Sequence, residues 1–111
     1  MSTPLRTAIL LAALGLPGLS VTAAQAQSAE IARGRTFAQA NCAVCHAIGR
    51  IGDSPLRAAP PFRALHLRYP VENLAEALAE GIVTAHPGMP QFRLEVGEIG
   101  DLIAYLKSLE G

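Results

Sequence analysis

The sequence predicts an all-α protein in which three to four short helices are joined by loops. Beyond residue 27, several segments space their apolar residues as one face of a helix does, and helix start or stop signals accompany them. In that part of the chain no segment alternates apolar and polar residues as a half-buried strand would. Glycine and proline punctuate the stretches in between. With 111 residues, the chain is expected to contain one folded domain.

The first 26 residues have the pattern of a secretory signal peptide. Arg6 gives a positively charged start, residues 8–16 are an apolar run, and residues 24–26 (AQA) form a small-x-small cleavage site. An uncleaved membrane anchor is the alternative, but the apolar run is short and glycine and proline interrupt it. We therefore expect cleavage after Ala26, export to the periplasm, and a domain of residues 27–111 that does not span a membrane.

The charge balance gives no case for a nucleic-acid partner. Nine basic and nine acidic residues give a formal net charge of zero, and cleavage would remove Arg6 and no acidic residue. Without a basic excess, neither nucleic acid nor an anionic membrane surface is a favoured partner. The expected domain is small, so it can bury little apolar surface in a core of its own. A large apolar cofactor inside it would add to the buried apolar surface.

Residues 28–41 are predicted to form the first helix. Ser28 suits the N-cap position, and apolar residues follow at the spacing of one helix face. Gly34 lies in the middle of this pattern, although glycine is a poor helix former. It is either merely tolerated there or marks a point where another backbone comes close.

Loops and helices alternate in the rest of the chain. Residues 47–61 are rich in glycine and proline and are predicted to form a loop, and residues 62–69 a short helical turn. Residues 71–80 carry a strong helix signal, with proline before them and glycine after them. Residues 85–92 (AHPGMPQF) are expected to form a tight loop, and residues 96–109 an amphipathic last helix.

Residues 42–46 (CAVCH) carry the strongest chemical signal in the chain. A C-x-x-C-H run is typical of haem c attachment. Cys42 and Cys45 lie within one helical turn, so that each can form a thioether with a haem vinyl group, and His46 can then bind the iron.

Other uses of a C-x-x-C pair are a redox dithiol, half of a zinc site, and a disulfide, which an exported chain would favour. A structural zinc site of the usual kind needs four ligands, often two such pairs, and this chain has only two cysteines. A thioredoxin-like dithiol is expected beside a βαβ pattern, which is absent here. We therefore favour one covalently attached haem c.

Met89 is the candidate for a second axial ligand of the iron. Apart from Met1, it is the only methionine in the chain, and Pro87 and Pro90 stiffen its loop. A thioether held on a rigid loop suits Met/His ligation, which raises the reduction potential of a haem. A methionine that merely fills space in the core is the alternative.

Two histidines are rivals of Met89. His86 lies in the same loop and is the better rival, whereas His66 has no second argument in its favour. A ligating histidine also needs a partner for its other ring nitrogen, and we expect a carbonyl of residues 59–61 to accept from Nδ1 of His46.

With these motifs, residues 29–109 resemble the class I cytochromes c in a compact bacterial form. The C-x-x-C-H run matches the haem-binding motif, Gly34 and Phe37 match positions of the N-terminal helix, and residues 101–107 (DLIAYLK) resemble the C-terminal helix. The resemblance implies that these two terminal helices cross, with Gly34 at the point of close approach.

The same resemblance implies the roles of two further residues. Pro60 would offer the carbonyl that accepts from the haem-ligating histidine, with Pro61 as the alternative, and Met89 would be the sixth ligand of the iron. The tryptophan that many members place beside a haem propionate is absent. Tyr69 or an arginine such as Arg50 or Arg57 is a candidate to take its place.

The function that the resemblance implies is electron transfer between redox partner proteins. The iron would cycle between Fe(II) and Fe(III), and with His46 and Met89 both bound it would offer no open site, so we expect no enzymatic activity. We also expect a monomer. Two alternatives remain: a haem subunit of a larger periplasmic oxidoreductase, or a five-coordinate haem protein that binds a gas or peroxide.

Overall fold

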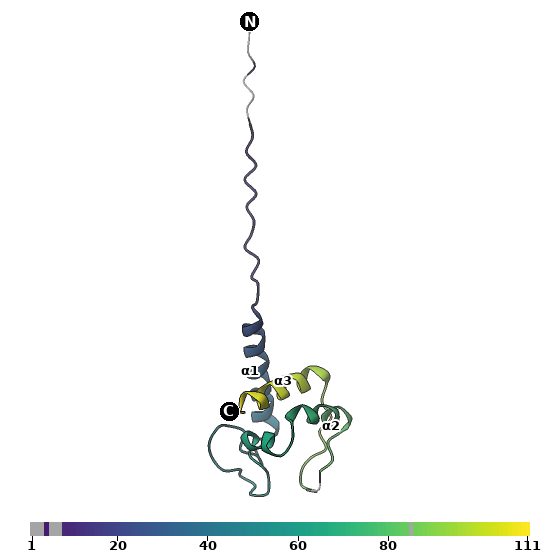
Figure 1. The fold of residues 1–111 in the computed structure, drawn as a ribbon. Coiled ribbons are helices and arrows are strands. Elements are labelled where there is room, and N and C mark those ends of the chain that lie inside the picture. Colours follow the sequence, from purple (N-terminus) through teal and green to yellow (C-terminus); the bar gives the residue numbers. More distant parts are fainter. Residues whose placement is uncertain (1–3, 5–7, 85) are drawn as a thin grey trace.

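The computed structural model describes residue 4, residues 8–84 and residues 86–111. An extended N-terminal segment leads into a group of helices joined by loops (Figure 1). Within the described residues there are three α-helices and two 3-10 helices, and no strand. The all-α prediction is therefore confirmed. Arg6, in the predicted signal peptide, and Ala85, in one predicted loop, lie outside the described residues.

Helix α1 (Ala23–Asn41) begins earlier than predicted. The side chain of Thr22 accepts a hydrogen bond from the backbone N–H of Gln25 at 3.2 Å, and Gln25 Oε1 accepts from the N–H of Thr22 at 3.0 Å. This reciprocal pair is a capping box, which satisfies two N–H groups that a helix start leaves unpaired. The prediction that Ser28 begins the helix was therefore wrong, and the expected cleavage bond after Ala26 lies within α1.

The middle of the chain forms shorter elements. A 3-10 helix, η1 (Phe62–Leu67), occupies the predicted helical turn. The predicted helix over residues 71–80 divides into a 3-10 helix, η2 (Val71–Asn73), and helix α2 (Leu74–Glu80). Gly81 follows α2 at a φ of 102°, which other residues rarely adopt, so the glycine allows the chain to turn there.

Helix α3 (Val96–Ser108) forms close to the predicted bounds and crosses α1 (Figure 1). At the crossing, a Cβ on Gly34 would lie 2.0 Å from the carbonyl oxygen of Asp101 and 2.8 Å from Cβ of Tyr105. No side chain fits in that space, which confirms that the two helices approach closely at Gly34. Beside the crossing, the Arg33 guanidinium donates two hydrogen bonds of 2.8 Å to the Asp101 carboxylate.

The buried core lies between α3 and the elements that pack on it. Its largest contribution comes from α3 itself, with further residues from α1, η1, η2 and α2. Within the described residues, no helix is both long enough and apolar enough to cross a membrane.

Candidate functional site

All five site residues predicted from the sequence line one cavity of about 580 Å³: Cys42, Cys45, His46, Pro60 and Met89. Cavities that enclose most of a small organic ligand have volumes of roughly 300–1,000 Å³, so this one is of the size that such a ligand needs. Its walls come from α1, η1, α2, α3 and the loops between them.

The C-x-x-C-H run reaches the cavity because it continues α1 by one turn. The backbone N–H of Cys42 donates to the carbonyl of Ala38 at 2.8 Å, and the N–H groups of Cys45 and His46 both donate to the carbonyl of Cys42. Both thiols are free and half-buried, so they are not joined in a disulfide. Burial raises the pKa of the Cys42 thiol to about 11.

The imidazole of His46 is held by the loop that follows it. Nδ1 lies 2.8 Å from the carbonyl oxygen of Pro60, which can only accept, so Nδ1 carries the proton. This bond leaves Nε2 with its lone pair available to a metal. The accepting carbonyl is that of Pro60 and not that of Pro61. The ring of Phe62 lies against the imidazole, with the two ring centres 5.1 Å apart.

Two polar side chains outside the predicted site residues, those of Tyr105 and Ser54, hold the loop after His46. The Tyr105 hydroxyl donates to the carbonyl of Ile48 at 2.6 Å, and the N–H of Ala47 donates to the Ser54 hydroxyl at 3.0 Å. Tyr105 could have been recognised as a candidate, because a buried tyrosine within an apolar helix face usually needs a partner for its hydroxyl.

The candidates for the second axial ligand differ in their positions. Met89 is half-buried and lines the cavity, and His86 also lines it but is exposed. The N–H of Met89 donates to the carbonyl of His86 at 3.0 Å, which forms a tight turn. His66 is not among the lining residues. The structure therefore leaves Met89 and His86 as the two candidates that reach the cavity.

The rest of the lining is largely apolar. Leucine, isoleucine, phenylalanine and proline side chains form most of it, and Arg68 is the only Asp, Glu, Lys or Arg among the described residues that line it. Tyr69 is also a lining residue, as suggested from the sequence, but Arg50 and Arg57 are not. Arg50 instead donates a hydrogen bond to the carbonyl of Ser108 at the end of α3.

The donor set fits a haem c better than it fits a zinc ion. Within the part of the chain that the structure describes, no three His, Cys, Asp or Glu residues lie close enough together to hold a metal ion. A structural zinc site would need four such ligands. Two thiols and an imidazole with a free Nε2 on one apolar cavity are the groups that a covalently attached haem needs.

A family model for cytochrome c matches residues 31–110. The chain belongs to the cytochrome c family. It is 38% identical over 80 residues to a cytochrome c-553-like protein of Synechocystis sp., an alignment that covers 69% of this chain and 67% of that protein. It is also 34% identical over 88 residues to cytochrome c-552 of Bradyrhizobium diazoefficiens, covering 79% of this chain and 83% of that protein. None of the solved structures gives a significant match.

As a class I cytochrome c, the chain is a haem electron-transfer protein with redox partner proteins, and its cofactor is covalently attached haem c. The cavity agrees with this assignment, because its lining supplies both thiols and an imidazole whose other ring nitrogen already has a partner.

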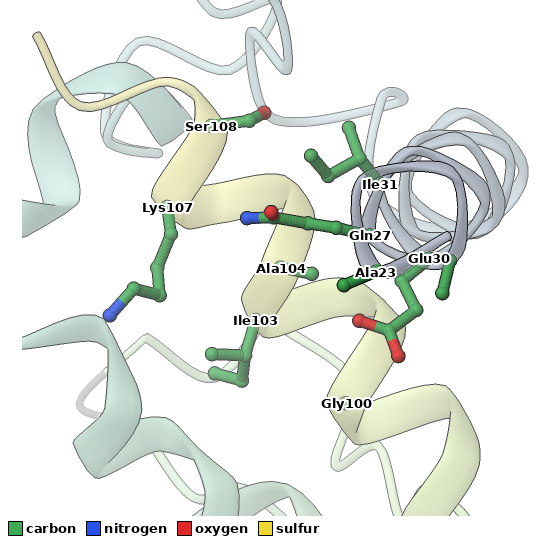
Figure 2. A pocket seen from close by; sticks show the side chains of 10 residues that line it. Ala23, Gln27, Glu30, Ile31, Gly100, Ile103, Ala104, Lys107 and Ser108 are labelled. Carbon is green, nitrogen blue, oxygen red and sulfur yellow. The ribbon is translucent and has the colours of Figure 1, made fainter.

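A second hollow, of about 680 Å³, lies between the first turns of α1 and the end of α3. Figure 2 shows its lining, which includes Ala23 and Ile31 on α1 and Ile103 and Ala104 on α3. None of the predicted site residues lines it. The expected cleavage after Ala26 would remove part of its wall, so we assign no function to it.

Proposed function

We propose that this cytochrome c is a periplasmic electron carrier with one haem c, held by Cys42 and Cys45 and with His46 and Met89 as axial ligands. The observation that carries the proposal is the cavity, whose lining brings these four residues together in otherwise apolar surroundings. Met89 is preferred to His86 because it is half-buried, whereas His86 is exposed to solvent.

The bound haem would supply a one-electron Fe(II)/Fe(III) couple. The chain's own residues tune and protect that couple. The Pro60 carbonyl fixes the orientation of His46, and the apolar lining keeps water away. Two axial ligands from the protein leave no open position for a substrate, so the function is electron transfer without enzymatic activity, and the carrier acts as a monomer.

Export is part of the proposal. A signal peptide of residues 1–26 would take the chain to the periplasm, and cleavage after Ala26 would leave residues 27–111 as the cytochrome c domain. Cleavage would also remove Thr22, which caps α1 in the full chain. Ser28, an exposed residue of α1, could then cap the shortened helix, because serine is a favoured N-cap residue.

Visible spectra of the purified holoprotein test this function. We expect the spectrum of a six-coordinate haem c in both oxidation states, with a sulfur-to-Fe(III) charge-transfer band at the red edge of the ferric spectrum. Carbon monoxide should bind the reduced protein slowly and weakly. Rapid, tight binding would instead indicate a five-coordinate gas- or peroxide-binding protein.

Two further measurements test the remaining parts of the proposal. The mass of the intact protein should equal that of residues 27–111 plus one haem, and a full-length chain would contradict cleavage. Purification from the native periplasm should give the carrier alone. A stoichiometric partner protein would indicate a subunit of a larger oxidoreductase.

A further inference from the structure

The segment that carries Met89 is a loop whose two ends meet beside the end of α2. The chain leaves α2, runs away from it and returns toward α3 (Figure 1). At the base of this loop, the N–H of Ile82 donates to the carbonyl of Phe92 at 3.0 Å. The N–H of Leu94 donates to the carbonyl of Leu78, on α2, at 2.8 Å. These backbone hydrogen bonds close the loop and attach its returning end to α2.

Arg93 adds a side-chain attachment at the same place. Its Nη2 donates to the carbonyl of Glu80, the last residue of α2, at 2.9 Å. Carbonyl groups in the last turn of a helix lack partners within the helix and carry the negative end of its dipole, so a guanidinium is favoured there. The last turn of α2 contains no basic residue of its own. Arg93 therefore supplies a cation that α2 lacks.

The other side-chain hydrogen bonds of the loop are local. The Thr84 hydroxyl and the backbone of His86 bond to each other, which shapes the loop but does not attach it to another element. Among the residues that the structure describes, Arg93 is the only one whose side chain hydrogen-bonds the segment over residues 82–93 to another element. Arg93 itself is exposed and does not line the haem cavity.

We propose that Arg93 is a positioning residue for Met89. Its hydrogen bond to Glu80 fastens the base of the loop and so limits how often Met89 leaves the cavity. Loops open by local unfolding while the rest of a protein stays folded, and each attachment lowers the open fraction. An outside ligand can bind only the open form, so its apparent affinity measures that fraction. The inference rests on the proposed ligation by Met89.

The test uses the ferric holoprotein and three variants. Arg93→Leu keeps an aliphatic side chain and removes the donor, whereas Arg93→Lys keeps a cation with N–H donors. Arg63→Leu is the matched control, because Arg63 also donates to a backbone carbonyl, that of Gly52 at 2.8 Å, but outside the Met89 loop. The measurements are the apparent affinity for added imidazole, the temperature at which the sulfur-to-Fe(III) band is lost, and global unfolding by circular dichroism.

Arg93→Leu should raise the apparent imidazole affinity by about threefold to tenfold, the factor that the loss of one ordinary hydrogen bond implies. It should also lower the temperature at which the sulfur-to-Fe(III) band is lost. Arg63→Leu should change neither the imidazole affinity nor this temperature. Arg93→Lys should have values of both that are closer to wild type than those of Arg93→Leu. The role of Arg93 is disproved if the Arg93→Leu and Arg63→Leu proteins bind imidazole alike, even if both unfold earlier. If wild-type protein lacks the band, ligation by Met89 fails, and the role of Arg93 fails with it.

Discussion

At the scale of single residues, the site depends on side chains that their neighbours orient toward the cavity. The imidazole of His46 is oriented for a metal because its Nδ1 lies 2.8 Å from the Pro60 carbonyl, so that Nε2 is the nitrogen left to bind. Met89, the proposed second ligand, is half-buried and lines the same cavity. A thioether is a poorer electron donor than imidazole, so it stabilises Fe(II) relative to Fe(III).

Replacing Met89 by alanine should therefore lower the reduction potential. We expect a decrease on the order of 0.1 V, since the choice of axial ligands sets haem potentials over a range of about 0.8 V. The sulfur-to-Fe(III) band should disappear in the same variant. Potentiometry with visible spectroscopy measures both effects, and His86→Ala, which should change neither, is the control. A band that survives in Met89→Ala would show that another ligand binds the iron.

At the scale of elements, the contact between α1 and α3 places the C-x-x-C-H run. The run continues the last turn of α1, so the position of α1 on α3 determines where both thiols lie. Gly34 allows the two helix backbones to approach, and Tyr105 beside it bonds the loop that follows His46. One helix crossing therefore positions the attachment site and steadies its loop.

Replacing Gly34 by alanine should destabilise the holoprotein by about 1–3 kcal/mol, the usual cost of overpacking. The added Cβ would lie 2.0 Å from a backbone oxygen of Asp101, and a backbone cannot yield as a flexible side chain can. Gly100→Ala on α3 is the control, because a Cβ there meets nothing within 4 Å, and we expect it to stabilise by about 0.5–1 kcal/mol through helix propensity. Urea unfolding followed by circular dichroism measures both changes, and equal stability of Gly34→Ala and wild type would contradict the prediction.

The ion pair between Lys107 of α3 and Glu72 of η2 should contribute to stability in a pH-dependent manner. Lys107 holds the pKa of the Glu72 carboxyl below its ordinary value of 4.5. A group whose pKa is lower in the folded protein stabilises it above the unfolded pKa, and that contribution disappears as pH falls through the folded pKa. Both side chains are exposed, so the effect is small.

Glu72→Gln should accordingly lose slightly less stability than wild type between pH 7 and pH 3. The measurement is the thermal unfolding midpoint of the holoprotein across this range. Glu76→Gln, at an exposed glutamate of α2 without an ion pair in the structure, serves as the control. Parallel pH profiles for wild type and Glu72→Gln would show that the ion pair between Glu72 and Lys107 makes no pH-dependent contribution to stability.

At the scale of the whole molecule, the core and the haem cavity share residues. Phe62, Leu65, Leu78, Leu102 and Leu106 belong to the buried core and also line the cavity. A chain of this size buries a modest fraction of its surface, so its stability is marginal without further support. The cofactor of a cytochrome c is therefore part of the core as well as the site of redox chemistry.

Removing both thiols, with Cys42→Ala and Cys45→Ala together, should leave the chain without covalent haem and largely unfolded. Empty, the cavity would leave those core side chains without packing partners on one side, and the stabilisation that a bound ligand gives to the folded state would be lost. Circular dichroism and urea unfolding of the purified chain measure this outcome. Wild-type chain produced without haem attachment is the control, and it should be as unfolded as the double variant. A folded, cooperatively unfolding haem-free chain would contradict the prediction.

The sequence by itself determined the fold class, the attachment motif and five of the residues that line the cavity. Local sequence patterns predict these features: the spacing of apolar residues predicts the helices, a five-residue run predicts the attachment site, and a single methionine between prolines predicts the second ligand. The start of α1 was missed although its capping box, Thr22 with Gln25, is visible in the sequence. The signal-peptide pattern covers the same residues, so two patterns overlap there.

Only the tertiary structure decided which partners lie across the fold. It selected Pro60 over Pro61 as the acceptor from His46, placed Arg68 at the cavity, and turned Arg50 toward the end of α3. It also brought Arg93 to the end of α2 beside the loop of Met89. Such contacts depend on how the helices cross and on where the loops return. Residue type and local spacing do not determine that geometry, so the sequence left Pro60 and Pro61 as alternatives and did not indicate Arg68 or Arg93.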